Sequence, residues 1–184
     1  MIARFALAAL VSLCLAVPAG AEGAEEPLPD FASCLNRAVA LYERDRPAEA
    51  DVVGILYCGT LGIVRCDRSP APYPCQHALA ETQEALRQQV LATLPPPEAL
   101  ADAGPLYRLS HALAVGRSAG PDCAGTTEPM EAWCEAHEAS LRLADAILTW
   151  QLARAKDAAP AAIEAGWAAP PPPVAPRLRP EAHR

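Results

Sequence analysis

The pentapeptide GRSAG, residues 116–120, matches the G-x-S-x-G pattern in which serine hydrolases place their nucleophile. In that fold the serine occupies a strained turn between a strand and a helix, and the turn lifts its hydroxyl into the active site. Here the residues before Ser118 have helical apolar spacing, and Pro121 stands where the next helix should begin. We therefore interpret Ser118 as part of a Gly/Ser turn and not as a nucleophile.

The histidines give only fragments of metal motifs. HEASL, starting at His137, begins like the H-E-x-x-H motif of zinc proteases, but a leucine replaces the second ligand. The Cys75/His77 and Cys134/His137 pairs fit no common ligand spacing. We therefore predict no catalytic residue, metal or cofactor. The alternative is a small envelope hydrolase or metal-dependent enzyme in which His77, His111 and His137 converge with helix carboxylates.

The first residues have the pattern of an export signal. Arg4 is the positive charge of a short n-region, and an apolar run from Phe5 to Val17 follows, ending in small residues at 19–21. The run is about 13 residues long, whereas a bilayer span needs roughly 20. We predict a signal peptide over 1–21, an acidic leader over 22–30, and a periplasmic or secreted protein without a transmembrane segment after cleavage. An uncleaved membrane anchor is the alternative.

The cysteines left after removal of the signal indicate a disulfide framework, because their number is even and the chain is exported. They are Cys34, Cys58, Cys66, Cys75, Cys123 and Cys134. Six cysteines allow 15 pairings. Cys66 and Cys75 flank the turn-rich DRSPAPYP, which favours a local bridge, and we complete the pairing with Cys123–Cys134 and Cys34–Cys58. Such pairing leaves no free thiolate for catalysis, and the chain has no C-x-x-C redox motif.

The composition of the chain limits the classes of partner that it can bind and the kind of core that it can form. The chain has 15 Lys and Arg against 22 Asp and Glu, a net charge of −7. An acidic protein repels phosphate backbones, so we expect no nucleic-acid partner. Aromatic residues are 5% of the chain, so alanine and leucine must form most of the core, and disulfides would offset the small apolar area.

Apolar periodicity predicts helices in the first part of the chain. Asp30 is a suitable N-cap for a helix over about 31–44. Its expected inner face is Phe31, Cys34, Leu35, Ala38 and Leu41. The segment 51–66 is apolar on all sides and should be buried, although its glycines leave two readings open: a helix followed by a turn, or a short strand.

Three further helices are expected. In 75–94 the leucines and Val90 should face inward and the Gln, Glu and Arg residues should face water. Pro105 should begin a short helix with Leu106, Leu109 and Leu113 inward. The longest helix should cover roughly 129–158, with an inner face of Met130, Cys134, His137, Leu141, Ala144, Leu148 and Leu152. We predict an all-α fold, an irregular disulfide-linked bundle of about five helices over 31–160.

Two further features concern partners. Residues 161–184 are Pro-rich without apolar periodicity, which predicts an extended or disordered tail. Its Arg177 and Arg179 are candidates for docking on an envelope partner. Trp133 and Trp150, seventeen residues apart, should lie about 20–30° apart around the longest helix, next to its predicted inner face. They either pack in the core or, if exposed, anchor a protein partner.

The layout resembles that of small exported bacterial proteins related to the lysozyme inhibitor LprI. The residues that carry the resemblance are CGTLGIVRC (58–66), TTEPM (126–130) and CEAHEASLRLADAIL, with Asp145 and Leu148. Thr149 stands where that family has Asn, and the aromatic residue three positions beyond is absent. The resemblance implies a helical domain that binds a protein, such as a lysozyme, rather than transforming a substrate. We therefore expect a non-enzymatic interaction protein that binds an envelope or extracellular protein, inhibitor-like or as an accessory subunit.

Overall fold

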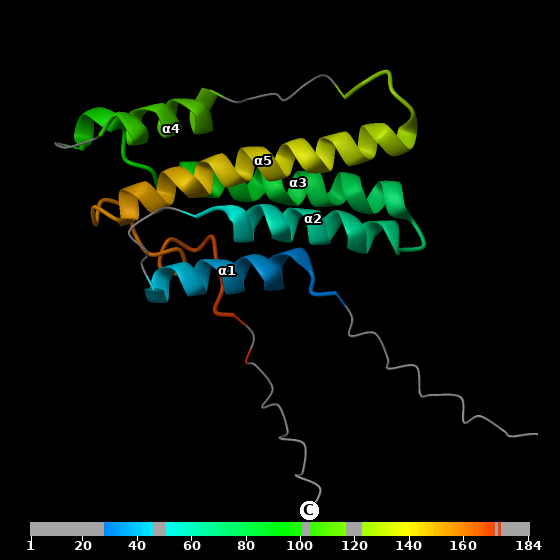
Figure 1. Cartoon of the computed structure of the whole chain (residues 1–184), viewed down its shortest axis with the longest axis horizontal. Coiled ribbons are helices and arrows are strands. Elements are labelled where there is room, and N and C mark those ends of the chain that lie inside the picture. The colour runs from blue at the N-terminus through cyan, green and yellow to red at the C-terminus, as the bar shows by residue number, and fades with distance from the viewer. Residues whose placement is uncertain (1–27, 46–50, 101–103, 117–122, 172, 174–184) are drawn as a thin grey trace, which may run out of the picture.

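A computed structural model describes residues 28–45, 51–100, 104–116, 123–171 and 173. These contain α1 (Phe31–Asp45), α2 (Val53–Asp67), α3 (Pro72–Leu91), the 3-10 turn η1 (Pro97–Ala99), α4 (Pro105–Gly116) and α5 (Glu128–Arg154) (Figure 1). No strand occurs in the described ranges. The predicted all-α bundle of about five helices is confirmed, and residues 53–66 of the uncertain segment lie in one continuous helix.

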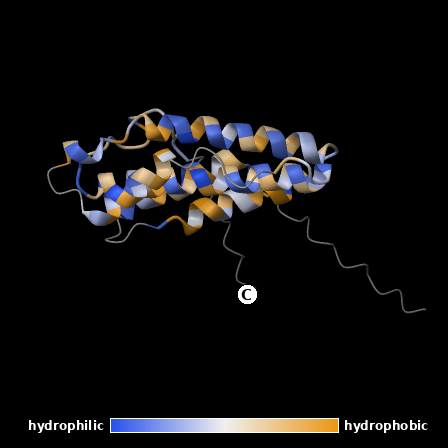
Figure 2. Cartoon of the chain, turned by 90° about the horizontal axis from the view of Figure 1, so that it is seen from above, coloured by the Kyte–Doolittle hydropathy of each residue, from blue (hydrophilic) through white to orange (hydrophobic). Residues whose placement is uncertain are grey.

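The longest helix, α5, is central to the bundle. It contacts α2, α3 and α4, whereas α1 packs on α2 and α3 also contacts α2. Figure 1 shows α4, α5 and α2 one below the next, with α1 beyond α2. Every helix in Figure 2 carries both hydrophilic and hydrophobic residues. Among the described residues, no helix is long and apolar enough to cross a bilayer.

The three disulfides have the pairing that the sequence favoured. Cys34–Cys58 joins α1 to α2, Cys66–Cys75 joins the end of α2 to the start of α3, and Cys123–Cys134 ties the preceding loop to α5. Their Cα–Cα distances are 5.5, 5.3 and 5.8 Å, within the ordinary range for a disulfide. Three bridges in one small domain indicate an oxidising, non-cytoplasmic environment.

Asp30 caps α1 as expected. Its carboxylate accepts hydrogen bonds from the backbone N–H of Ser33 at 2.8 Å and from the Ser33 hydroxyl at 2.9 Å. These hydrogen bonds lower the pKa of Asp30, with a smaller contribution from Arg65. Arg65 also donates to the backbone carbonyl of Leu28 at 2.7 Å, so α2 holds the chain just before the cap.

The inner sides of several helices differ from the sequence prediction. On α1, Val39 and Tyr42 are buried and Leu41 is exposed. On α3, the interior contains Gln76, Gln83 and Arg87, which we expected to face water. They are tolerated there because they form internal polar contacts: the Gln83 side chain accepts from Ser140, and Arg87 donates to the Ala114 carbonyl at 2.8 Å.

The inner side of α5 consists largely of alanine and not of the predicted leucine stripe. Of that stripe only Ala144 is buried, whereas Met130 is exposed. Small side chains let neighbouring helices approach closely, and α2 contributes two glycines to the same effect. A Cβ atom on Gly59 would lie 2.8 Å from the Ser140 Cβ, and one on Gly62 would lie 2.8 Å from a Leu79 methyl group.

The folded body continues past the predicted boundary at residue 160. Ala162 is fully buried and Trp167 nearly so, and the Trp167 ring meets the Trp150 ring edge-on with centroids 4.8 Å apart. The backbone N–H of Ala169 donates to Asn36 Oδ1 at 2.9 Å. The prediction of an unpacked tail from 161 is therefore wrong for residues 161–169, because Trp167 completes the core beside Trp150. Residues 174–184 lie outside the described part.

Candidate functional site

Alpha-helix geometry shows which side of α5 is uncovered. Ser140 meets Gly59 of α2, and Thr149 meets Ser110 of α4 with 2.5 Å between their hydroxyl oxygens. At about 100° per residue these two positions lie roughly 180° apart around α5. One intervening side contacts α3, through the Arg142–Glu84 and Glu135–His77 pairs. The other side has no helix against it among the described residues.

That uncovered side of α5 carries the stripe that the sequence predicted as its inner face. Met130, His137, Leu141 and Leu148 fall near the middle of this side. Met130 is exposed, and the other three are half-buried. The stripe is therefore a real feature of the helix, but it points away from α3 and not into the core.

Like α5, helix α2 is apolar on its packed side and also on a side that no other described helix covers. Gly62 faces α3 through Leu79, and Cys58 faces α1 through its disulfide. Val53 and Tyr57 lie on the opposite side from Gly62, and both are well exposed. The expectation that this whole segment is buried is wrong on that side.

Besides the exposed apolar side chains of α5 and α2, a third row of them lies on α4. Ser110 faces α5, while Tyr107 donates from its hydroxyl to the Pro95 carbonyl just beyond α3, at 2.6 Å. Leu106, Leu109 and Leu113 lie on the other flank of Ser110, away from α3. All three are exposed, so their predicted inward orientation is wrong. The small polar Ser110 and the hydrogen-bonded Tyr107 form the true packing side.

These rows turn to the same side of the molecule, because each points away from α3. We call this surface the open face, defined by Val53, Tyr57, Leu106, Leu109, Leu113, Met130 and Trp133, which are 44–70% exposed. The half-buried leucines of the α5 stripe lie between the α2 and α4 rows. Seven of the ten large apolar side chains exposed among the described residues belong to it.

The α2 and α4 parts of the open face are also depleted of charge. Residues 53–64 contain no Asp, Glu, Lys or Arg, and α4 has a single such residue, Arg108, on the flank away from its leucines. One residue in five of the whole chain is charged. Contiguous apolar surface mostly marks an interaction site, and loss of charge is typical of the centre of a protein interface.

The two tryptophans of α5 have different environments. Trp150 is fully buried, contacts Tyr42 and donates from Nε1 to the Pro160 carbonyl at 3.0 Å, so it is not a partner anchor. Trp133 is exposed at the α2 edge of the open face, stacked on His137 with ring centroids 4.8 Å apart and planes within 9°. The expected separation of about 20–30° is wrong: seventeen residues at about 100° each place the two side chains roughly 100° apart around α5, so one is buried while the other is exposed.

The histidines contact separate partners. His77 on α3 lies 2.7 Å from a Glu135 oxygen, His111 packs against Tyr107, and His137 stacks on Trp133. No group of three His, Cys, Asp or Glu residues suitable for a metal occurs among the described residues. Ser118, Arg177 and Arg179 lie outside the described ranges, so their interpretations remain predictions.

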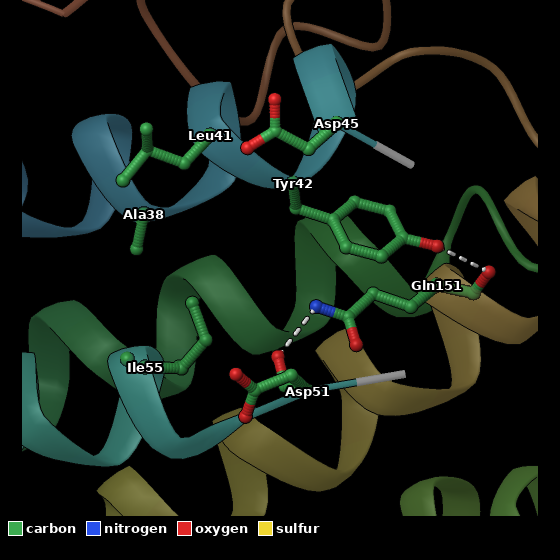
Figure 3. Close-up of a pocket in the computed structure, with 8 residues that line it drawn as sticks. Ala38, Leu41, Tyr42, Asp45, Asp51, Ile55 and Gln151 are labelled. Carbon is green, nitrogen blue, oxygen red and sulfur yellow. Dashed lines mark hydrogen bonds between the residues drawn. The ribbon is translucent and has the colours of Figure 1, made fainter. Parts of the chain in front are cut away.

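A cavity of about 280 Å³ lies where α1, α2 and α5 meet (Figure 3). Its polar groups join the helices. The Tyr42 hydroxyl donates to the Gln151 carbonyl at 2.9 Å, and Gln151 Nε2 donates to the Asp51 carbonyl at 2.8 Å. Asp45 in turn pairs with Arg44. We interpret this cavity as a polar seam that fixes α1 against α5.

Neither a protein-family model, nor a curated protein, nor a solved structure matches the chain. The open face is thus the site that the structure itself singles out. The sequence contained its signal, because the leucines of α4 and the α5 stripe are regularly spaced, but the spacing does not tell an internal contact from an external one.

Proposed function

We propose that this is an exported, non-enzymatic interaction protein that binds an envelope or extracellular protein through the open face. The observation that carries the proposal is an apolar surface that spans three helices and has no charged residue in its α2 and α4 rows, in an otherwise charged chain. Trp133 at its edge is of the residue type most enriched among binding hot spots. The separate environments of His77, His111 and His137 give no support to the hydrolase alternative.

Two roles fit such a module: inhibitor or accessory subunit. The resemblance to LprI-related proteins makes a lysozyme one candidate partner. An acidic body around the apolar face would attract a cationic partner and speed its association. The test of this role is residual lysozyme activity with increasing amounts of the mature protein. Undiminished lysozyme activity would leave the accessory role as the proposal.

The binding site is tested by crosslinking the mature protein in envelope extracts and identifying the stoichiometric partner. Leu109→Glu places a charge in the open face and should abolish capture. Ile163→Glu is the matched control, because Ile163 is an exposed apolar residue outside the face and its variant should capture normally. A chain lacking 174–184 tests docking by Arg177 and Arg179. Equal capture by Leu109→Glu and Ile163→Glu would refute the open face as the site.

A further inference from the structure

We infer that, in the free protein, the open face is covered by the open face of a second copy of this chain. This inference rests on the proposed function, because it describes what occupies the same site before the partner arrives. It follows from the size, the charge and the symmetry of the surface.

The size of the face suits a dimer. Its seven defining side chains offer on the order of 700 Å² of exposed surface, close to the roughly 800 Å² that each partner contributes to a standard interface. The half-buried leucines of α5 add to this area. A smaller apolar patch would not repay the entropy lost when two chains associate.

Charge favours pairing through this face over other parts of the surface. Each chain has a net charge of −7, so two copies repel each other through their acidic sides. The α2 and α4 rows of the open face carry no carboxylate, and the carboxylates of α5 nearest to the face, Glu138 and Asp145, lie at its α4 edge. Homodimer interfaces are also the most apolar class of protein interface.

The arrangement of the rows is compatible with two-fold symmetry. The leucines of α4 stand at i, i+3 and i+7, the spacing by which one helix presents a row to another surface. In a symmetric pair, the α4 row of each copy would lie over the α5 stripe of the other, between its α2 and α4 rows. Leu109 would then contact Leu148 of the second copy, and the contact would occur twice.

The experiment is analytical ultracentrifugation of the mature, disulfide-bonded protein at concentrations up to about 100 µM. We expect a reversible monomer–dimer equilibrium. Leu109→Glu and Tyr57→Glu should each weaken dimerisation by at least about tenfold, because each buries two new charges per dimer. Ile163→Glu should dimerise like the wild type. Circular dichroism checks that the variants remain folded, as expected for substitutions at exposed positions.

Salt gives an independent readout. Raising NaCl from about 50 mM to about 500 mM screens the repulsion between the acidic bodies and should tighten the dimer. A dimer held by ion pairs would weaken instead, and that result would overturn the inference. So would a wild-type monomer at every concentration, or dimers of unchanged affinity in both face variants. If a monomeric wild type still loses its envelope partner on Leu109→Glu, the proposed function stands and only the dimer fails.

Discussion

The Ser140 hydroxyl on α5 donates a hydrogen bond to Oε1 of Gln83 on α3, over 2.8 Å, between two buried side chains. The same hydroxyl also donates to the Ala136 carbonyl at 3.0 Å, so its proton is shared. The Nε2 atom of Gln83 is buried without a partner in the described part of the chain. One half of this amide is thus satisfied and the other half is not.

This asymmetry predicts that substitutions at the two positions differ in cost. Ser140→Ala leaves Gln83 Oε1 unpaired as well and should lower the free energy of unfolding by about 1–3 kcal/mol. Gln83→Met removes both amide atoms at similar volume and should change it by less than about 1.5 kcal/mol. Urea unfolding of both variants and of the double variant measures the coupling. A Ser140→Ala protein as stable as the wild type would show that the hydrogen bond contributes nothing.

The glycines of α2 predict a second contrast. Gly59→Ala places a Cβ atom 2.8 Å from the Ser140 Cβ, which forces α2 and α5 apart and should cost about 1–3 kcal/mol. In Gly54→Ala the new Cβ lies 3.6 Å from the Ala38 Cβ, an ordinary contact. Because alanine favours helix, this control should be neutral or more stable by up to about 1 kcal/mol. Thermal unfolding of the Gly59→Ala and Gly54→Ala variants tests this contrast. Equal melting temperatures would contradict the close packing of α2 on α5.

Trp167 and Trp133 form a matched pair for the folded C-terminal segment. Trp167→Ala opens a hole beside Trp150 and should reduce the free energy of unfolding by about 3–5 kcal/mol. Trp133→Ala removes an exposed ring and should cost less than about 1 kcal/mol. Denaturant unfolding followed by circular dichroism measures both. If Trp167→Ala proved as mild as Trp133→Ala, residues 161–169 would not belong to the core.

Asp30 makes the stability of α1 depend on pH. The Ser33 hydrogen bonds lower the pKa of Asp30 in the folded state, so ionisation of this carboxylate stabilises the fold. This contribution is present above the unfolded pKa, near 3.8, and is lost as the pH falls through the lowered folded value. We expect Asp30→Ala to destabilise the protein by about 0.5–2 kcal/mol at pH 7 and by less at pH 2. Urea unfolding at the two pH values measures the difference, and an equal cost at both would contradict the cap.

The elements could be predicted from the sequence because helix signals are local. Pro105 begins a helix, Asp30 caps one, and the turn between Cys66 and Cys75 brings those cysteines together. Each of these features depends on a few consecutive residues. These features could therefore be predicted without knowing how helices distant in the sequence pack against one another.

Which side of a helix faces inward could not be predicted, because apolar spacing identifies a stripe without saying what covers it. Leu106, Leu109 and Leu113 form a regular stripe that this chain leaves uncovered. The true seams use small or polar residues, such as Ser110 against Thr149, which hydropathy patterns rank as surface. The candidate site was hidden in the sequence for the same reason, since its leucines were assigned to the core.

The order of the disulfides has a consequence for how the protein reaches its folded state. Each cysteine from Cys34 onward pairs with its neighbour in the sequence, over separations of 24, 9 and 11 residues, so no bridge crosses another. In a chain that emerges with its N-terminus first into an oxidising compartment, every cysteine meets its native partner before a competing one appears. Oxidation during translocation then produces the native bridges directly, without the slow reshuffling that crossed connectivities require.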